Sequence, residues 1–333
     1  MDLEFTDEQR LLGESAERFF GDNYDLPKRR ERTATKRGFD EALWQEMGEL
    51  GWLALRLPER LDGFGAGMVE CVVVMEAAGK SLAAEPLLNN AVIAATALDA
   101  SGSDDTEFAQ GIASGECTVA LAYAEPRSRY SLQRVATSAV ADDGTYTLSG
   151  TKSVVSFGGS ANKLIVSART SGKLADAAGI TLFWVDADAT GISIRDYPTV
   201  DGLRAADISF DNVKVDATNV LGAADDGLRV LNQIVDEAII AVCAEAVGAL
   251  QHLHEATLEY VKTRKQFGLP IAKFQVIQHR LVDMYVALEL ARSMTLLAAA
   301  GMGSANAQER ARLASTAKVK VGEAIRLVGQ DAV

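Results

Sequence analysis

The sequence predicts a mainly helical α+β protein in which a small β domain lies between two helical regions. Apolar residues recur at helical spacing through the first third of the chain, and from about Thr118 the spacing changes to a period of two. Helical spacing returns at about Asp225 and continues to Val333. We therefore expect an N-terminal α-helical domain at residues 1–117, a β domain at 118–224 and a C-terminal helical bundle at 225–333.

Capping and periodicity define the helices of the first domain. Thr6 and Gln9 form a T-x-x-Q capping box at the start of the first helical pattern. Three further helices are predicted, covering Phe39–Leu50, Met68–Lys80 and Pro86–Ala100. The last of these is largely apolar and should form the wall of a buried pocket.

A glycine-rich segment, Leu57–Gly67, separates two of these helices. Its three glycines suggest a phosphate-binding loop, but no Lys-Ser or Lys-Thr pair follows and no strand precedes it. We expect a tight turn instead.

Seven short segments of period two predict the strands of a small barrel or sandwich. They are Thr118–Tyr123, Ser138–Ala141, Tyr146–Ser149, Lys163–Ala168, Gly179–Val185, Ile192–Ile194 and Ile208–Val215. Asp142-Asp143-Gly144 is a hairpin turn signal between the second strand and the third.

Long helices dominate the last third. One pattern starts at Asp225 and runs to about Gln266, which is ~60 Å of helix at 1.5 Å per residue. Two more cover Phe274–Met302 and Ala307–Val333, and helices of this length usually form a bundle. The last pattern ends without a cap, so we expect the chain to be truncated.

Composition excludes several classes of protein. A net charge of −13, from 46 acidic and 33 basic side chains, argues against a nucleic-acid surface. The three cysteines are scattered and predict neither a disulfide framework nor a metal site, and His252 and His254 cannot converge on one metal. No apolar run is long enough to insert in a membrane, and the acidic start lacks the features of a signal peptide. We therefore expect a cytoplasmic protein.

The most informative segment joins two of the long helices. Arg264-Lys-Gln-Phe-Gly268 is followed by Phe274-Gln-Val-Ile-Gln278-His-Arg-Leu-Val-Asp-Met284. An arginine fork binds a pyrophosphate in a bidentate way, and glutamine amides supply both donors and acceptors. These residues suit an anionic, partly aromatic ligand, although a solvated helix end would have the same composition.

The order of residues in this corner resembles that of the acyl-CoA dehydrogenase flavoprotein family. Four other segments resemble motifs of the same family, in the same order along the chain. They are Leu57–Gly67, Tyr123–Pro126, Gly150–Gly159 and Ala206–Gly222. The resemblance therefore extends over the whole chain.

The resemblance implies FAD, with its flavin ring between the β domain and the C-terminal helices. Tyr123 and Ala124 would contact the ring through backbone groups, Ser156 would place its hydroxyl beside flavin N5, and Val154 replaces the usual tryptophan cover. The corner would contact the pyrophosphate and adenosine of FAD in a neighbouring subunit, through Arg264, Gln266, Phe267, Gln275 and Gln278. It also implies a homo- or hetero-oligomer and an acceptor such as an electron-transfer flavoprotein.

The sequence departs from the family pattern in two places. Arg127-Ser-Arg129-Tyr130 replaces a run of small residues after Glu125-Pro126, so a flavin or CoA pyrophosphate would be held differently here, or not at all. The chain also ends before the Gly-Gly loop with which the family continues.

The catalytic base is harder to assign. The family places a glutamate either beyond residue 333 or on the long helix, 26 residues before the corner arginine, where this chain has Ala238. Glu237 is our candidate, and Asp236 and Glu245 are alternatives on the same helix. Each of the three is also explained as a structural or pocket-lining residue.

The resemblance predicts a FAD-dependent acyl-CoA dehydrogenase, an oxidoreductase of lipid β-oxidation that desaturates an acyl-CoA thioester between its α and β carbons. The alternative is a non-catalytic partner subunit of a heteromeric acyl-CoA dehydrogenase. Ala238, the altered Arg127–Tyr130 segment and the early end of the chain favour that alternative. An oxidase or flavin monooxygenase on the same fold is a third, smaller possibility.

Overall fold

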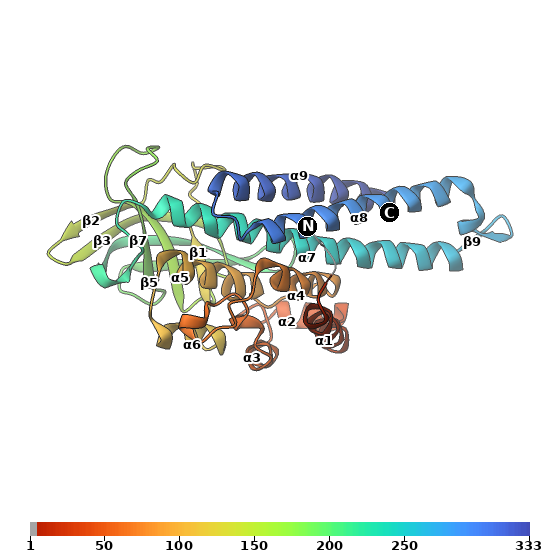
Figure 1. The fold of residues 1–333 in the computed structure, drawn as a ribbon, viewed down its shortest axis with the longest axis horizontal. Coiled ribbons are helices and arrows are strands. Elements are labelled where there is room, and N and C mark those ends of the chain that lie inside the picture. Colours follow the sequence, from red (N-terminus) through yellow and green to blue (C-terminus); the bar gives the residue numbers. More distant parts are fainter. Residues whose placement is uncertain (1–4) are drawn as a thin grey trace. The chain divides into compact units, whose positions relative to one another are not determined.

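A computed structural model describes residues 5–333, so the first four residues of the stretch examined for a signal peptide lie outside it. The N- and C-terminal parts are helical and the central part is a β-sheet (Figure 1), which confirms the predicted fold class. The three domain ranges given above remain a prediction. By packing, the chain forms two compact units, each of which combines segments that are distant in sequence.

The first unit, which we call the helical unit, contains the chain up to Asp25 together with Gly67–Ala83 and Asp236–Val333. Its helices are α1 (Asp7–Asn23), α4 (Met68–Lys80), α7 (Gly227–Thr263) from Asp236 onwards, α8 (Gln275–Gly301) and α9 (Ala307–Asp331). The predicted capping box is confirmed, because the Gln9 N–H donates to Thr6 Oγ1 (3.2 Å) and the Thr6 N–H donates to Gln9 Oε1 (3.0 Å).

Close backbone contact joins α4 to α7 in the helical unit. A Cβ atom added to Gly79 would lie 1.9 Å from the carbonyl oxygen of Glu245, and one added to Gly248 would lie 1.9 Å from that of Glu76. Only glycine allows two helices to approach this closely. Arg292 of α8 then connects both helices, since it donates to Glu76 Oε1 (2.9 Å) and to Gln251 Oε1 (2.7 Å).

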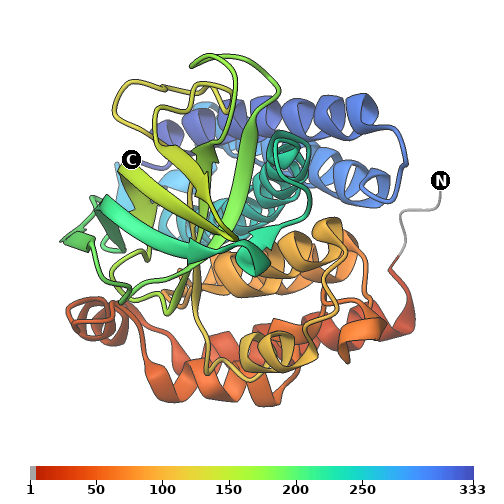
Figure 2. The same ribbon diagram turned by 90° about the vertical axis from the view of Figure 1, so that its left-hand side faces the viewer.

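The second unit, the sheet unit, comprises Leu26–Ala66 and Ala84–Val235. Its strands form one eight-stranded, strongly twisted sheet (Figure 2) in the order β6-β7-β3-β2-β4-β5-β8, with β1 paired to β4. They are β1 (Val119–Ala122), β2 (Ser138–Asp142), β3 (Thr145–Ser156), β4 (Lys163–Arg169), β5 (Ile180–Asp186), β6 (Ile192–Pro198), β7 (Arg204–Asp216) and β8 (Val220–Leu221). The hydrogen-bonded path ends at β6 and β8, so the predicted barrel is an open one.

All seven predicted strands are present, and β8 is additional. The hairpin at Asp142–Thr145 is confirmed, with positive φ at both Asp143 and Gly144, as its turn type requires. The pairing of β1 with β4 is parallel, which strand periodicity does not reveal.

The sheet unit also contains several short helices. They are α2 (Leu26–Thr33), α3 (Glu41–Glu49), the π-helix η3 (Leu88–Ala94), α5 (Ala95–Ser101) and α6 (Thr106–Ala113). Helix α2 was not predicted, because it buries none of its residues and so has no apolar face. Nor was α6, whose eight residues are too few for a clear period.

Two short strands, β9 (Lys265–Gln266) and β10 (Leu269–Pro270), form the connection between α7 and α8 in the helical unit. Within residues 5–333 no helix combines the length and apolarity needed to cross a membrane.

Candidate functional site

A bulge in β3 places Val154 on the surface of the sheet unit. The register of β3 against β7 shifts between Lys152 and Val155, and Val154 has φ +53 with 64% of its surface exposed. A β-branched residue in this region is strained, and such strain is often found at functional sites. The bulge therefore marks a candidate site.

Asp207 of β7 holds the bulge in place. Its Oδ1 accepts from the Val154 N–H (3.2 Å) and from the Tyr197 hydroxyl (3.0 Å), and its Oδ2 accepts from Arg195 (2.5 Å). The hydrogen bond from Arg195, together with those from Val154 and Tyr197, keeps the pKa of Asp207 below its ordinary value. The carboxylate therefore stays ionised and fixes the backbone of Val154.

The residues that follow β1 lie beside this bulge. The carbonyl of Ala124 accepts from the Ser153 N–H (2.9 Å), which brings Tyr123 and Ala124 next to Val154. Ser156, at the end of β3, is also exposed. The structure thus brings Tyr123, Ala124, Val154 and Ser156 together. They come from two segments that are distant in the sequence, since Tyr123 lies 29 positions before Lys152, the residue at which the bulge begins.

Two buried asparagines of the π-helix support the same strands. Asn89 Nδ2 donates to the carbonyls of Val119 (2.9 Å) and Ser156 (3.3 Å). Asn90 donates to the Cys117 carbonyl (2.7 Å) and accepts from the Val119 N–H (3.1 Å). The backbone of Ser156 is therefore fixed, whereas its hydroxyl makes no hydrogen bond within the described residues.

A buried ion pair lies directly behind these positions. Lys152 donates to Glu125 Oε1 (2.8 Å), Ser167 Oγ (3.0 Å) and the carbonyl of Tyr123 (3.4 Å). Glu125 also accepts from the backbone N–H groups of Ala136 (2.7 Å) and Thr137 (3.0 Å). Sequence reasoning missed this pair, although the alternation from Leu148 places Lys152 on the buried face of β3.

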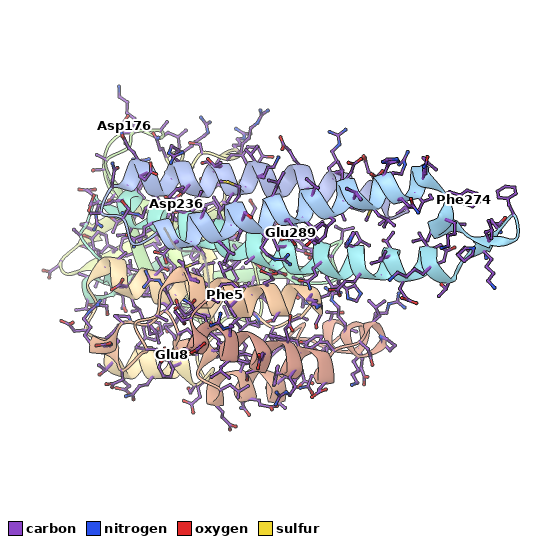
Figure 3. All side chains as sticks on the ribbon, turned by 45° about the vertical axis from the view of Figure 1, so that its right-hand side comes forward. Phe5, Glu8, Asp176, Asp236, Phe274 and Glu289 are labelled. Atoms are coloured by element: carbon purple, nitrogen blue, oxygen red, sulfur yellow. The ribbon has the colours of Figure 1, made fainter. Side chains whose placement is uncertain are left out.

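The corner residues form a separate, exposed group in the helical unit. Arg264 follows α7, and its side chain makes no hydrogen bond or ion pair within residues 5–333. Phe267, at the tip of the β9–β10 hairpin, is 90% exposed and packs edge-on against Phe274 with ring centroids 6.1 Å apart. Figure 3 shows Phe274 at the start of α8, where the connection from the hairpin enters the helix.

The glutamines of the corner differ in their contacts. Gln278 Nε2 donates to the carbonyl of Ala272 (2.9 Å) and so orders the turn before α8. Gln266 and Gln275 are exposed. The side chains of Arg264, Gln266 and Gln275 therefore remain accessible to a ligand.

The candidate base, Glu237, is buried in α7, with 1% of its surface exposed. Its neighbour Asp236 is half-buried; burial raises the pKa of Asp236, and the nearby Arg310 opposes that rise. Ala238 carries no acid, as the sequence requires.

A large cavity of the sheet unit lies elsewhere. Its volume is about 960 Å³, and it is lined by residues of 28–42 and 159–162. None of the ten predicted site residues lines it. Within the described residues no cluster of histidine, cysteine or acidic side chains is arranged to hold a metal ion.

Family models match the chain in three consecutive segments. The acyl-CoA dehydrogenase N-terminal domain matches residues 6–116, the middle domain matches 120–213 and the C-terminal domain matches 225–333. The helical N-terminus, central sheet and C-terminal helices are the architecture of flavoprotein oxidoreductases of this type. The chain belongs to the acyl-CoA dehydrogenase family.

Comparisons with individual proteins give the same result. The acyl-CoA dehydrogenase FadE12 of Mycobacterium tuberculosis is 32% identical over 319 residues, which cover 92% of this chain and 79% of FadE12. The ChsE4–ChsE5 complex of the same organism contains a chain that is 27% identical with a TM-score of 0.88, covering 100% of this chain and 87% of that one. A protein described as an FAD-dependent dehydrogenase is 28% identical with a TM-score of 0.87, covering 100% and 88%.

These findings confirm the predicted family and confirm FAD as the cofactor of the family. Its members are oxidoreductases, and its solved structures include complexes. The comparisons do not favour the alternative of a non-catalytic partner subunit.

The residues present fit a flavin. The bulge offers an exposed apolar side chain at Val154 and the exposed hydroxyl of Ser156, beside backbone groups of Tyr123 and Ala124. A ring that is apolar on its faces and polar at its edge needs this combination. At the corner, the exposed guanidinium of Arg264 matches a pyrophosphate.

Proposed function

We propose that the chain is a FAD-dependent acyl-CoA dehydrogenase that desaturates an acyl-CoA thioester between its α and β carbons. The observation that carries this proposal is the bulge of β3, which gathers residues from two separate family-like segments on one surface of the sheet unit. Bound FAD would accept the hydride from the β carbon.

Each predicted residue then has a role. Tyr123 and Ala124 contact the flavin through their backbone, Val154 covers the ring and Ser156 donates its hydroxyl toward N5. Arg264, Gln266, Phe267, Gln275 and Gln278 hold the pyrophosphate and adenosine end of FAD in a neighbouring subunit, so that an oligomer is required. The exposure of Arg264, Gln266 and Phe267 supports this assignment.

Glu237 is the carboxylate that we propose as the base for the α proton. Its burial supports this role, because a base must be shielded from water to act on a weakly acidic carbon. Glu237→Gln keeps the shape of the side chain and removes its basicity. The variant should bind acyl-CoA and lose turnover by a factor of at least ~100.

The function is tested by product analysis. The purified holoprotein is mixed with acyl-CoA thioesters of several chain lengths and an artificial electron acceptor, and the products are identified by mass spectrometry. We expect one or more thioesters to lose two hydrogen atoms. If no thioester loses hydrogen while FAD is bound, the proposed reaction is wrong.

If Glu237→Gln turns over normally, Glu237 is not the base. If Ala238→Glu also increases activity, the position of Ala238 is the one from which a carboxylate can act.

A further inference from the structure

A short surface segment of the sheet unit is strongly basic in an otherwise acidic chain. Residues 126–135 contain three arginines and no acidic residue, whereas the whole chain has 46 acidic and 33 basic side chains. Arg127, Arg129 and Arg134 are all exposed. Within the described residues none of them makes a hydrogen bond or an ion pair, so all three guanidinium groups are available to an external anion.

Several other exposed arginines of this chain pair with a nearby carboxylate. Arg10 pairs with Asp7 (2.7 Å), Arg229 with Asp226 (2.8 Å) and Arg312 with Glu309 (2.6 Å). Within the described residues, Arg18, Arg30 and Arg264 are also exposed and make no side-chain hydrogen bond or ion pair, but they lie far apart in the sequence. The segment at 127–134 brings three such arginines together within eight residues.

Hydrogen bonds to neighbouring segments fix the backbone of residues 126–135. Ser128 is buried, and its hydroxyl donates to the Glu125 carbonyl (3.0 Å) and accepts from the Glu125 N–H (3.1 Å). Arg169 donates to the carbonyl of Gln133 (2.7 Å), and the Val135 N–H donates to the carbonyl of Leu174 (3.1 Å). These contacts present the arginines on a defined frame, which lowers the entropy lost on binding.

An aromatic ring completes the cluster. Tyr130 is 98% exposed, an unusual position for a large, partly apolar side chain. Guanidinium groups bind phosphates in a bidentate way, and an exposed aromatic ring stacks on a nucleobase. The combination suits a ligand that carries several phosphates and a purine.

The segment also begins at the proposed flavin surface. Arg127 is three residues from Ala124, which limits the distance between their Cα atoms to about 11 Å. A thioester whose carbonyl lies at the flavin would extend away from it through its pantetheine arm.

We propose that Arg127, Arg129, Arg134 and Tyr130 bind the 3′-phosphoadenosine diphosphate end of the CoA substrate. This inference rests on the proposed function and specifies the residues through which this chain, unlike the family pattern of small residues, recognises CoA. The arginines bind the phosphates and the tyrosine stacks on adenine. Recognition at this end is independent of the acyl chain.

The test uses the holoprotein and three probes measured by calorimetry at fixed ionic strength: CoA, 3′-dephospho-CoA and pantetheine. The triple variant Arg127→Gln/Arg129→Gln/Arg134→Gln should raise the Kd of CoA at least tenfold and remove the preference for CoA over 3′-dephospho-CoA. Pantetheine binding should not change. With acyl-CoA, KM should rise while kcat stays the same, because the substituted groups act on the distant nucleotide.

The control carries the same change of charge elsewhere. Arg10→Gln/Arg18→Gln/Arg30→Gln alters three exposed arginines of α1 and α2, and it should leave the Kd of CoA unchanged. An equal rise in Kd in both triple variants would reduce the effect to net charge and overturn the proposal.

Two further outcomes separate this proposal from the proposed function. If the wild-type protein desaturates acyl-CoA and the Arg127/Arg129/Arg134 variant binds CoA normally, the cluster is not the CoA site and the function stands. If that variant binds CoA normally but loses electron transfer to a protein acceptor, the cluster is a docking surface, which also contradicts the proposal. A wild-type protein that binds neither CoA nor acyl-CoA would overturn both.

Discussion

Lys152 Nζ lies 2.8 Å from Glu125 Oε1, and the side chain of Lys152 is completely buried. The two residues belong to the segments that supply the proposed flavin contacts, since Glu125 follows Ala124 and Lys152 precedes the bulge at Val154. Burial lowers the pKa of Lys152 to about 8, and Glu125 opposes that fall. Burial alone would raise the pKa of Glu125, but Lys152 and two backbone donors more than offset it and the pKa lies below its ordinary value.

Breaking this pair should destabilise the sheet unit. Lys152→Met leaves a buried carboxylate without its cation, and such changes cost about 3–5 kcal/mol in free energy of unfolding. Urea unfolding at pH 7 measures the loss. Lys152→Met/Glu125→Gln should recover most of it, since no uncompensated charge then remains. A double variant that is as unstable as the sum of the two single variants would contradict this account of the pair.

Glu85 should give the protein a distinct pH dependence. This carboxyl is 6% exposed, and burial raises its pKa from 4.5 to about 7, against hydrogen bonds that lower it. A raised folded-state pKa means that the folded state holds its proton at higher pH than the unfolded state does. The stabilisation is fully present below pH 4.5 and is lost as the pH rises through 7.

Glu85→Gln should therefore remove a fall in stability between pH 5 and pH 8, and at pH 8 it should be more stable than wild type by up to about 3 kcal/mol. Urea unfolding at both pH values is the measurement. Glu116→Gln, which changes an exposed carboxyl of the same unit, should keep the wild-type pH dependence. A Glu85→Gln variant that is less stable at pH 8 would show that the carboxylate is stabilising.

Arg264→Ala should lower FAD occupancy without unfolding the chain. The side chain is exposed and makes no contact that the fold requires within residues 5–333, but a charge-assisted bidentate contact with pyrophosphate should be worth about a tenfold change in affinity. The ratio of flavin to protein absorbance after gel filtration reports it. Lys262→Ala, at the end of the same helix, is the control and should retain its flavin. Full occupancy in Arg264→Ala would remove this residue from the cofactor site.

Ser156→Ala should slow flavin reduction and leave folding intact. Its hydroxyl makes no hydrogen bond within the described residues, so no structural contact is lost. Removing one donor from a preorganised site costs about 100- to 1000-fold in rate, and we expect a smaller loss, of about tenfold, at this exposed position. Stopped-flow absorbance after mixing with acyl-CoA gives the rate. Ser209→Ala, on the exposed side of β7, should react at the wild-type rate, and an equal rate in Ser156→Ala would leave Ser156 without a role.

Periodicity predicts most of the fold because each strand and long helix has one buried face. The capping box at Thr6, the hairpin at Asp142–Thr145 and the seven strands were all readable from local spacing. The parallel pairing of β1 with β4 depends on contacts between distant segments, so it was not. Helix α2 was missed because nothing in its composition distinguishes a solvated helix from a loop.

The candidate site, too, was only partly predictable from the sequence. Its residues were found through family-like motifs, whereas the bulge that gives Val154 its left-handed backbone is a property of the β3–β7 register. The partnership of Lys152 and Glu125 was also not predicted, because 27 positions separate them and only the folded sheet brings them together.

The central claim is that this chain binds FAD and transfers electrons to it from an acyl-CoA. The most direct measurement is the visible absorbance spectrum of the purified protein under anaerobic conditions, before and after an acyl-CoA is added. We predict a flavin spectrum that is bleached by at least one thioester. A protein that binds FAD but keeps its full flavin absorbance with every thioester, or that binds no FAD at all, would contradict the claim.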